Sequence, residues 1–172
     1  MHLKLLTILK MLLSISIPVL SCLFILLISV VPQPLTDSAI ISIQMTHTAV
    51  FYWSIYTPKE IPNFVLFALG ILQDILLGLP LGISSFSFIC IHFFVTYKND
   101  YFIGKSFFHH WLIFSFIFMA LTLLNWLIMM AINGLMFNPL PIVFQYIITV
   151  SFYPCAAWLF GKLKKIKYNR LS

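Results

Sequence analysis

Asp74 is the residue whose chemistry stands out, because it is the acidic side chain that falls inside an apolar segment of the sequence. It lies midway between Gly70 and Gly78, and Gln73 precedes it. Residues spaced by four share one stripe of an α-helix, so the two glycines allow a neighbouring helix to approach beside the carboxylate. A carboxylate at mid-helix in hydrocarbon costs at least about 2.5 to 3.5 kcal/mol. We therefore expect Asp74 to face protein or water and to have partners.

Three roles are open to this carboxylate. The favoured one is structural: the turn from Leu79 to Gly82 brings the next helix back, and its free N–H groups would donate hydrogen bonds to Asp74. The others are contact with a partner protein and binding of a proton or ligand. Asp74 is expected about 6 Å from the outer end of its helix, away from the midplane where coupling ions usually bind. The candidate residues for helix packing or partner interaction are Gly70, Gln73, Asp74, Gly78, Pro80 and Gly82.

Two histidines, His47 and His92, also fall inside apolar segments. A relay between them and Asp74 is conceivable, but packing histidines are favoured. We expect no metal and no cofactor, because no Cys/His set has metal-ligand spacing. No nucleophile motif or phosphate-binding glycine loop is present, and a two-carboxylate mechanism would need groups from opposite faces of the membrane. The sequence therefore predicts no catalytic residues and no enzyme.

The composition determines which elements must hold these residues. Hydrophobic residues make up 62% of the 172 residues and charged residues 8%, whereas a soluble domain carries about 25% charged residues. The sequence predicts a single all-α membrane domain, a bundle of six transmembrane helices at about 11–31, 39–56, 63–78, 82–97, 107–133 and 139–160. The third and fourth, at 16 residues each, are shorter than the ~20 that a bilayer needs. Either the bilayer thins there or the two form a hairpin that stops short, and full crossing is favoured because the charges then fit.

All ten Lys and Arg residues fall on one side of such a bundle when both termini are placed in the cytoplasm. The three opposite connections, 32–38, 79–81 and 134–138, carry none. Positive residues mark the cytoplasmic side. The net charge of +6 is thus a topology signal that contacts membrane lipids, and we expect no nucleic-acid partner. The sequence predicts a multi-pass membrane protein with both termini in the cytoplasm.

Other polar and aromatic side chains have expected places in the bundle. Asn125 is expected to hydrogen-bond between helices. Aromatic rings are expected mostly at the two membrane interfaces, where they anchor helices; these are Tyr52, Trp53, Tyr56, Tyr97, Tyr101, Trp111 and Trp158.

The stretch Gly70 to Gly82 resembles the glycine–aspartate–glycine segment of the rod shape-determining MreD family of bacteria. The resemblance extends along nearly the whole chain: a first span ending in Pro32-Gln33-Pro34, Tyr97-Lys98 closing the fourth, Tyr153-Pro154 in the last, and a lysine-rich tail. The polar cluster of Gln44, Thr46, His47 and Thr48 departs from the family pattern and leaves the packing partner of the second span open.

This resemblance implies a non-enzymatic, multi-pass scaffold of the cell-elongation complex in the bacterial inner (cytoplasmic) membrane. It would regulate cell shape and lateral peptidoglycan synthesis through MreC, MreB and the RodA–transpeptidase machinery. The resemblance also implies a fold similar to the substrate-binding subunits of energy-coupling-factor transporters.

Two alternatives remain. One is a small-molecule (vitamin)-binding subunit of an energy-coupling-factor transporter, although the first span lacks the alanine pair spaced by four that such subunits commonly carry. The other is a membrane enzyme acting on lipid, which would have to use Asp74 with His47 or His92.

Overall fold

The computed structural model of the chain describes residues 17–29, 44–102, 104–133 and 139–171. All regular elements in these ranges are helical. They are the Ile17–Ser29 helix, α2 (Met45–Tyr56), the short 3-10 helix η1 (Pro58–Glu60), α3 (Asn63–Leu77), α4 (Ile83–Tyr97), α5 (Asn99–Phe102), α6 (Phe107–Asn133) and α7 (Leu140–Leu171).

The helices follow the expected apolar segments closely. The bounds of α3, α4 and α6 agree with expectation to within one residue. The short helix α5 was not expected, and α7 continues past the expected end of its span, at 160, to Leu171. This continuation has a simple cause, because the lysines that end the apolar run are good helix formers. Parts of the first two expected spans, 11–16, 30–31 and 39–43, lie outside the described residues.

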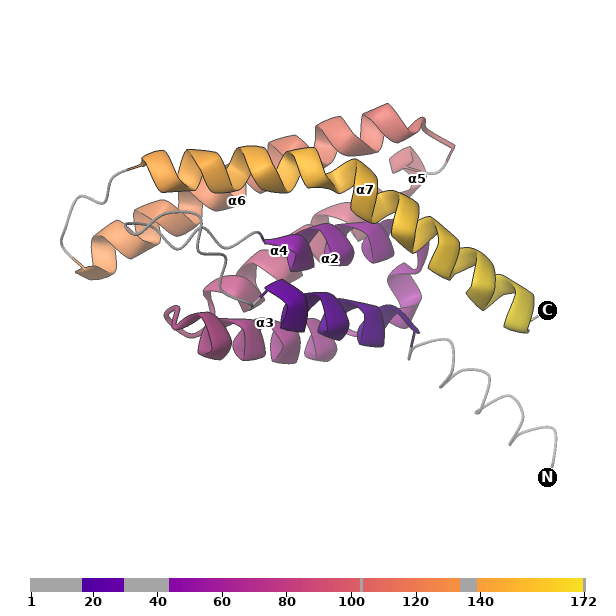
Figure 1. Cartoon of the computed structure of the whole chain (residues 1–172), viewed down its shortest axis with the longest axis horizontal. Coiled ribbons are helices and arrows are strands. Elements are labelled where there is room, and N and C mark those ends of the chain that lie inside the picture. The colour runs from indigo at the N-terminus through magenta and orange to yellow at the C-terminus, as the bar shows by residue number, and fades with distance from the viewer. Residues whose placement is uncertain (1–16, 30–43, 103, 134–138, 172) are drawn as a thin grey trace, which may run out of the picture.

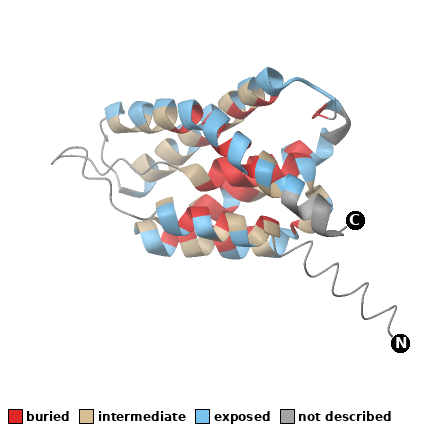
Figure 2. Cartoon of the chain, turned by 45° about the vertical axis from the view of Figure 1, so that its right-hand side comes forward, coloured by how far each residue is buried: buried red, intermediate tan, exposed pale blue. Residues whose placement is uncertain are grey.

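Helix α2 forms the centre of the bundle (Figure 1). It packs against α4 and α7, while α3 pairs with α4 and α6 pairs with α7. Ten of its twelve residues are buried, from Thr46 to Ile55, and Figure 2 shows the buried residues gathered around this central helix. Three residues of the polar cluster, Thr46, His47 and Thr48, therefore lie in the core, and the second span packs mainly against α4 and α7, with a smaller contact to α6.

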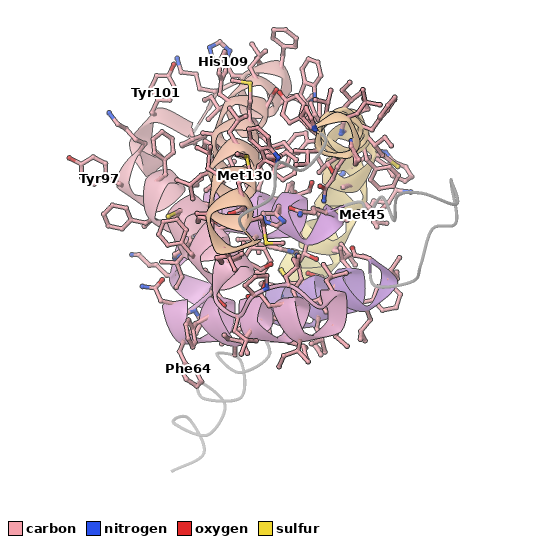
Figure 3. The ribbon with its side chains drawn as sticks, turned by 90° about the vertical axis from the view of Figure 1, so that its left-hand side faces the viewer. Met45, Phe64, Tyr97, Tyr101, His109 and Met130 are labelled. Atoms are coloured by element: carbon pink, nitrogen blue, oxygen red, sulfur yellow. The ribbon has the colours of Figure 1, made fainter. Side chains whose placement is uncertain are left out.

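The outer surface of the bundle is apolar. Phe64 is 79% exposed and Phe93 is 70% exposed, and large hydrophobic side chains are exposed along α3, α4, α6 and α7 as well. Phe64, Tyr97 and Tyr101 point away from the ribbon in Figure 3. Two helices, Phe107–Ile132 and Leu140–Lys165, are long and apolar enough to cross a membrane. An apolar outer surface of this kind suits a lipid environment rather than water.

The rings expected in an aromatic belt differ in their exposure. Tyr97, Tyr101 and Trp158 are exposed, whereas Tyr52 and Trp53 are buried in the core. Trp53 is fully covered because it faces the Ile17–Ser29 helix, where its Nε1–H donates to Ser21 Oγ at 2.8 Å. Tyr52 and Trp53 therefore pack inside the bundle, because α2 is covered by other helices along nearly its whole length.

Helix α7 contains a proline, Pro154, at which the hydrogen-bond ladder is interrupted. Proline has no N–H, so the carbonyl of Val150 loses its usual donor four residues later. The indole Nε1–H of Trp111 on α6 donates to this carbonyl at 3.0 Å. The bond satisfies the carbonyl and ties α6 to α7 at the same point.

Candidate functional site: a carboxylate at a helix start and the cavity beside it

The Asp74 carboxylate lies at the N-terminus of α4. Its Oδ2 accepts a hydrogen bond from the backbone N–H of Gly82 at 2.7 Å, and its Oδ1 accepts one from the N–H of Ser84 at 3.1 Å. The side chain is fully buried. Helix N-termini leave backbone donors unsatisfied and favour negative charge. The hydrogen bonds expected from the sequence are therefore present, and the carboxylate caps the start of α4 from the preceding helix.

Two glycines shape the turn that makes this capping possible. Gly78 has φ +65° and ends α3. Its N–H donates to the carbonyl of Ile75, and the N–H of Leu79 donates to the carbonyl of Asp74 at 2.9 Å, which is the Schellman arrangement of a helix end. Gly82 has φ +102° at the start of α4. Both backbone conformations are ones that residues with a Cβ rarely adopt.

Gly70 lies at a close approach between α3 and α4. A Cβ built on it would collide with the backbone N and Cα of Ser85. The hydroxyl of Ser85 in turn donates to the carbonyl of Phe67 at 2.9 Å. The glycine on α3 and the serine on α4 thus form one close contact, and Ser85 is a participant that the sequence reading missed.

The remaining two candidate residues have different surroundings. Pro80 lies within the turn, and its carbonyl accepts from the N–H of Ile83 at 3.4 Å. Gln73 is 2% exposed, and its amide Oε1 has no hydrogen-bond partner. The structure therefore places all six candidate residues in one α3–α4 hairpin. Gln73 is buried on α3 of this hairpin.

Neither histidine belongs to an Asp74 relay. His92 Nδ1 lies 3.0 Å from Ser54 Oγ. His47 is buried between the edges of Phe88 and Phe118, and neither ring nitrogen has a partner. Within the described residues, no histidine ring hydrogen-bonds to the Asp74 carboxylate, because its two oxygens bind the start of α4. The relay hypothesis is therefore not supported, and His47 packs without the hydrogen bonds expected of a packing histidine.

A cavity of about 290 Å³ lies beside the hairpin. We call it the outer cavity, because it is bounded by the helix ends expected on the outer side: the start of α2, the α3–α4 turn, the end of α6 and the start of α7. Its polar lining residues are Gln44, Ser84, Thr122, Asn125, Trp126 and Gln145. Leu79 and Ile83 contribute apolar wall. Ser84, whose N–H binds Asp74, joins the two features into one site.

The outer cavity contains both satisfied and unsatisfied polar groups. Asn125 Nδ2 donates to Ser87 Oγ at 3.2 Å, which confirms the expected bond between helices. In contrast, the indole Nε1–H of Trp126 is buried without a partner, as are the hydroxyls of Thr46 and Thr149 elsewhere in the described residues. Sequence reasoning missed Trp126, since nothing in its neighbourhood marks it as different from an interfacial tryptophan.

The family model of the rod shape-determining protein MreD matches residues 9–163 of the chain. The chain belongs to the MreD family. No curated protein and no solved structure matches it. The MreD match includes the whole α3–α4 hairpin and every residue that lines the outer cavity. Membership of the MreD family makes this protein a rod shape-determining membrane protein, and it places the Asp74 hairpin within a family of shape-determining rather than catalytic proteins.

Proposed function

We propose that this protein is a non-enzymatic scaffold of the bacterial cell-elongation complex. In this role it binds MreC, MreB and the RodA–transpeptidase pair and helps to direct lateral peptidoglycan synthesis. The observation that carries the proposal is the family match over residues 9–163. The structure supports it with broad apolar faces on α3, α4, α6 and α7, which are available to other membrane helices.

The role of Asp74 also favours a scaffold over an enzyme. Both carboxylate oxygens accept backbone hydrogen bonds, so the group is engaged in holding α4 rather than placed beside a substrate. A general acid or base needs a reacting proton within hydrogen-bond reach. The buried position of Asp74 between two helices does not offer that access.

The scaffold is proposed to cross the inner membrane six times with both termini in the cytoplasm. The described lysines support this orientation. Lys59 follows α2, Lys98 follows α4, Lys105 precedes α6, and Lys162 lies in the C-terminal part of α7. These helix ends lie at the right of Figure 1, whereas the α3–α4 turn lies at the opposite end. Segregation of positive charge to one end is the pattern of a cytoplasmic face.

A complementation experiment tests the proposal. In a rod-shaped bacterium depleted of its own MreD, this protein should restore rods, and depletion alone should give round cells.

Asp74→Leu should weaken co-purification with MreC, because loss of the α4 cap distorts the hairpin. Ser84→Ala is the matched control, since the hydrogen bond to Asp74 uses the backbone N–H of Ser84. Unchanged rods after deletion of the native gene from its host would contradict the proposal.

Photo-crosslinking identifies the face that binds each partner. A photoreactive phenylalanine can replace one exposed residue on each of four helices: Phe64 on α3, Phe93 on α4, Phe116 on α6 and Trp158 on α7. These side chains are more than half exposed, so substitution leaves the core intact. A scaffold should give crosslinks to elongation proteins from at least one face in native membranes. Crosslinks to lipid alone from all four faces would count against it.

The outer cavity favours a second candidate function, the binding of a small molecule from outside the cell. The cavity has polar groups that could bind a ligand. Its volume of about 290 Å³ is close to the lower size limit of ligand pockets, about 300 Å³. Calorimetry with vitamins in detergent distinguishes the two functions. Specific binding that Trp126→Phe alters would favour the transporter-like function, and absence of binding would favour the scaffold.

A further inference from the structure

A second cavity, of about 440 Å³, lies at the opposite end of the bundle between α2, α6 and α7. We call it the inner cleft. Its floor is buried and consists of Tyr52, His110 and Tyr153, while its rim is exposed and includes Tyr56 and Trp158. Figure 1 shows α7 crossing the end of α2 in this region. The cleft is therefore open at the surface and closed by aromatic rings inside.

The small residues of α7 leave this space unfilled. Ala157 and Gly161 lie one turn apart on the helix and both line the cleft. A Cβ built on Gly161 would lie 3.8 Å from the hydroxyl of Tyr52, an ordinary contact distance. Pro154, one turn earlier, also lines the cleft. The cavity thus results from a face of α7 with little side-chain volume, set against tyrosines of α2.

Two lysines fold back over the rim. Lys164 Nζ lies 3.9 Å from the ring centre of Tyr56, and Lys162 Nζ lies 3.7 Å from that of Trp158. Within the described residues neither ammonium makes an ion pair. The acidic residues on this side of the expected topology are Glu60 and Asp100, against all ten basic residues of the chain. The rim is therefore positively charged, and the tyrosine ring that lies under Lys164 carries a hydroxyl group.

We propose that the inner cleft binds the headgroup phosphate of an anionic phospholipid of the cytoplasmic leaflet. Lys162 and Lys164 pair with the phosphate, and the hydroxyl of Tyr56 donates a hydrogen bond to it. Basic pockets between helices on the cytoplasmic side suit such headgroups. The exposed rings of Phe107 and Trp158 give the cleft apolar edges that an acyl chain can follow. A free phosphate ion would gain nothing from these edges, which favours lipid as the source of the phosphate.

This inference depends on the proposed orientation but not on any partner protein. Lipid binding by the purified chain in detergent therefore tests it separately from the scaffold function. The measurement is native mass spectrometry with phosphatidylglycerol and phosphatidylethanolamine of identical acyl chains. We expect the wild-type protein to prefer phosphatidylglycerol. The pair Lys162→Gln and Lys164→Gln should weaken phosphatidylglycerol binding roughly tenfold or more.

The matched control is the pair Lys98→Gln and Lys165→Gln, which removes the same charge from exposed lysines, whereas the rings of Tyr56 and Trp158 at the rim are covered by Lys164 and Lys162. Binding should stay within about twofold of wild type, since diffuse attraction is screened over a Debye length. Tyr56→Phe keeps the ring under Lys164 and removes the hydroxyl, so it should weaken binding several-fold without unfolding the protein.

Four results obtained with the purified protein would overturn the proposal. They are equal binding of the two lipids by the wild-type protein, equal losses in the two lysine pairs, competition by inorganic phosphate at the concentration that lipid requires, and full phosphatidylglycerol binding by Tyr56→Phe. Photo-crosslinks from position 158 in native membranes that reach a polypeptide but no lipid would also overturn it. The wild-type lipid preference is measured without any substitution, so a variant that fails to fold does not leave the proposal without a test.

Discussion

At the scale of single residues, the carboxylate of Asp74 holds two backbone donors at once, one on each oxygen. Asp74→Leu leaves both N–H groups without a partner, at a cost of about 1 to 3 kcal/mol each. Asp74→Asn keeps one carbonyl oxygen and should lose roughly half as much. Thermal unfolding in detergent should rank the proteins wild type, Asn, Leu. An Asn variant as unstable as the Leu variant would show that charge, rather than hydrogen bonding, holds α4.

Gly70→Ala should separate α3 from α4. The added methyl meets the backbone of Ser85, which cannot rotate away, and overpacking of this kind costs about 1 to 3 kcal/mol. Gly161→Ala is the control, because its methyl has room and alanine favours a helix by up to about 1 kcal/mol over glycine. The midpoint of unfolding should fall for the first variant and stay or rise for the second. Equal shifts of the two midpoints would mean that the close contact between Gly70 and Ser85 does not determine the stability of the protein.

The residue-level features that could be predicted are those set by local rules. The spacing of Asp74 from Gly82 predicts the cap, because every helix start has free N–H groups and a short turn brings them near. The sequence could not predict that the ring nitrogens of His47 and Trp126 lack hydrogen-bond partners. Their surroundings come from helices far apart in the sequence, and whether a partner atom is within reach depends on the packing of all of them.

At the scale of elements, the Trp111 indole replaces the donor that Pro154 removes from α7. A double-mutant cycle tests this. Trp111→Phe should cost about 1 kcal/mol in the wild-type background and less beside Pro154→Ala, because alanine restores an N–H for the carbonyl of Val150. Trp126→Phe is the matched control, since its Nε1–H has no partner and its cost should not depend on residue 154. Equal costs of Trp111→Phe in both backgrounds would contradict the assignment.

Helix bounds could be predicted well wherever composition changes sharply. α6 begins after a basic, glycine-containing turn, and α3 ends at Gly78, so both limits are visible in the sequence. The four residues of α5 were missed, because polar residues such as Asn99 and Asp100 indicate a loop. Phe102 of α5 is buried and packs against Phe51 and the ring of His110. Tertiary contact therefore decides this helix rather than local sequence.

At the scale of the whole molecule, the proposed topology predicts which positions face each side. In a background without Cys22, Cys90 and Cys155, single cysteines can replace Leu81 in the α3–α4 turn and Lys59 and Lys105 at the opposite end. Leu81 and both lysines are exposed. A membrane-impermeant maleimide should label position 81 in intact cells, and positions 59 and 105 only after lysis. Labelling of position 59 in intact cells would contradict six crossings.

The order of packing around α2 could not be predicted from the sequence. Charge placement indicates on which side each connection lies, but apolar faces rich in Phe, Ile and Leu fit many neighbours equally well. The polar face of α2 would have indicated an exposed or lumen-facing helix, yet Thr46, His47 and Thr48 are buried between α4, α6 and α7. The fold class was thus accessible, while the arrangement of helices required the structure.

The two flanks of the molecule differ in height, and this has a consequence for its neighbours. α6 has 27 residues whereas α3 and α4 have 15 each, so their lengths are about 40 Å and 22 Å. In the proposed topology with six crossings, lipids beside the short flank compress to meet it, at a cost of a fraction of a kcal/mol per Å. A second protein seated on this flank removes that compression. The difference in helix length therefore favours contact of another membrane protein with the α3–α4 flank, even before any specific contact is formed.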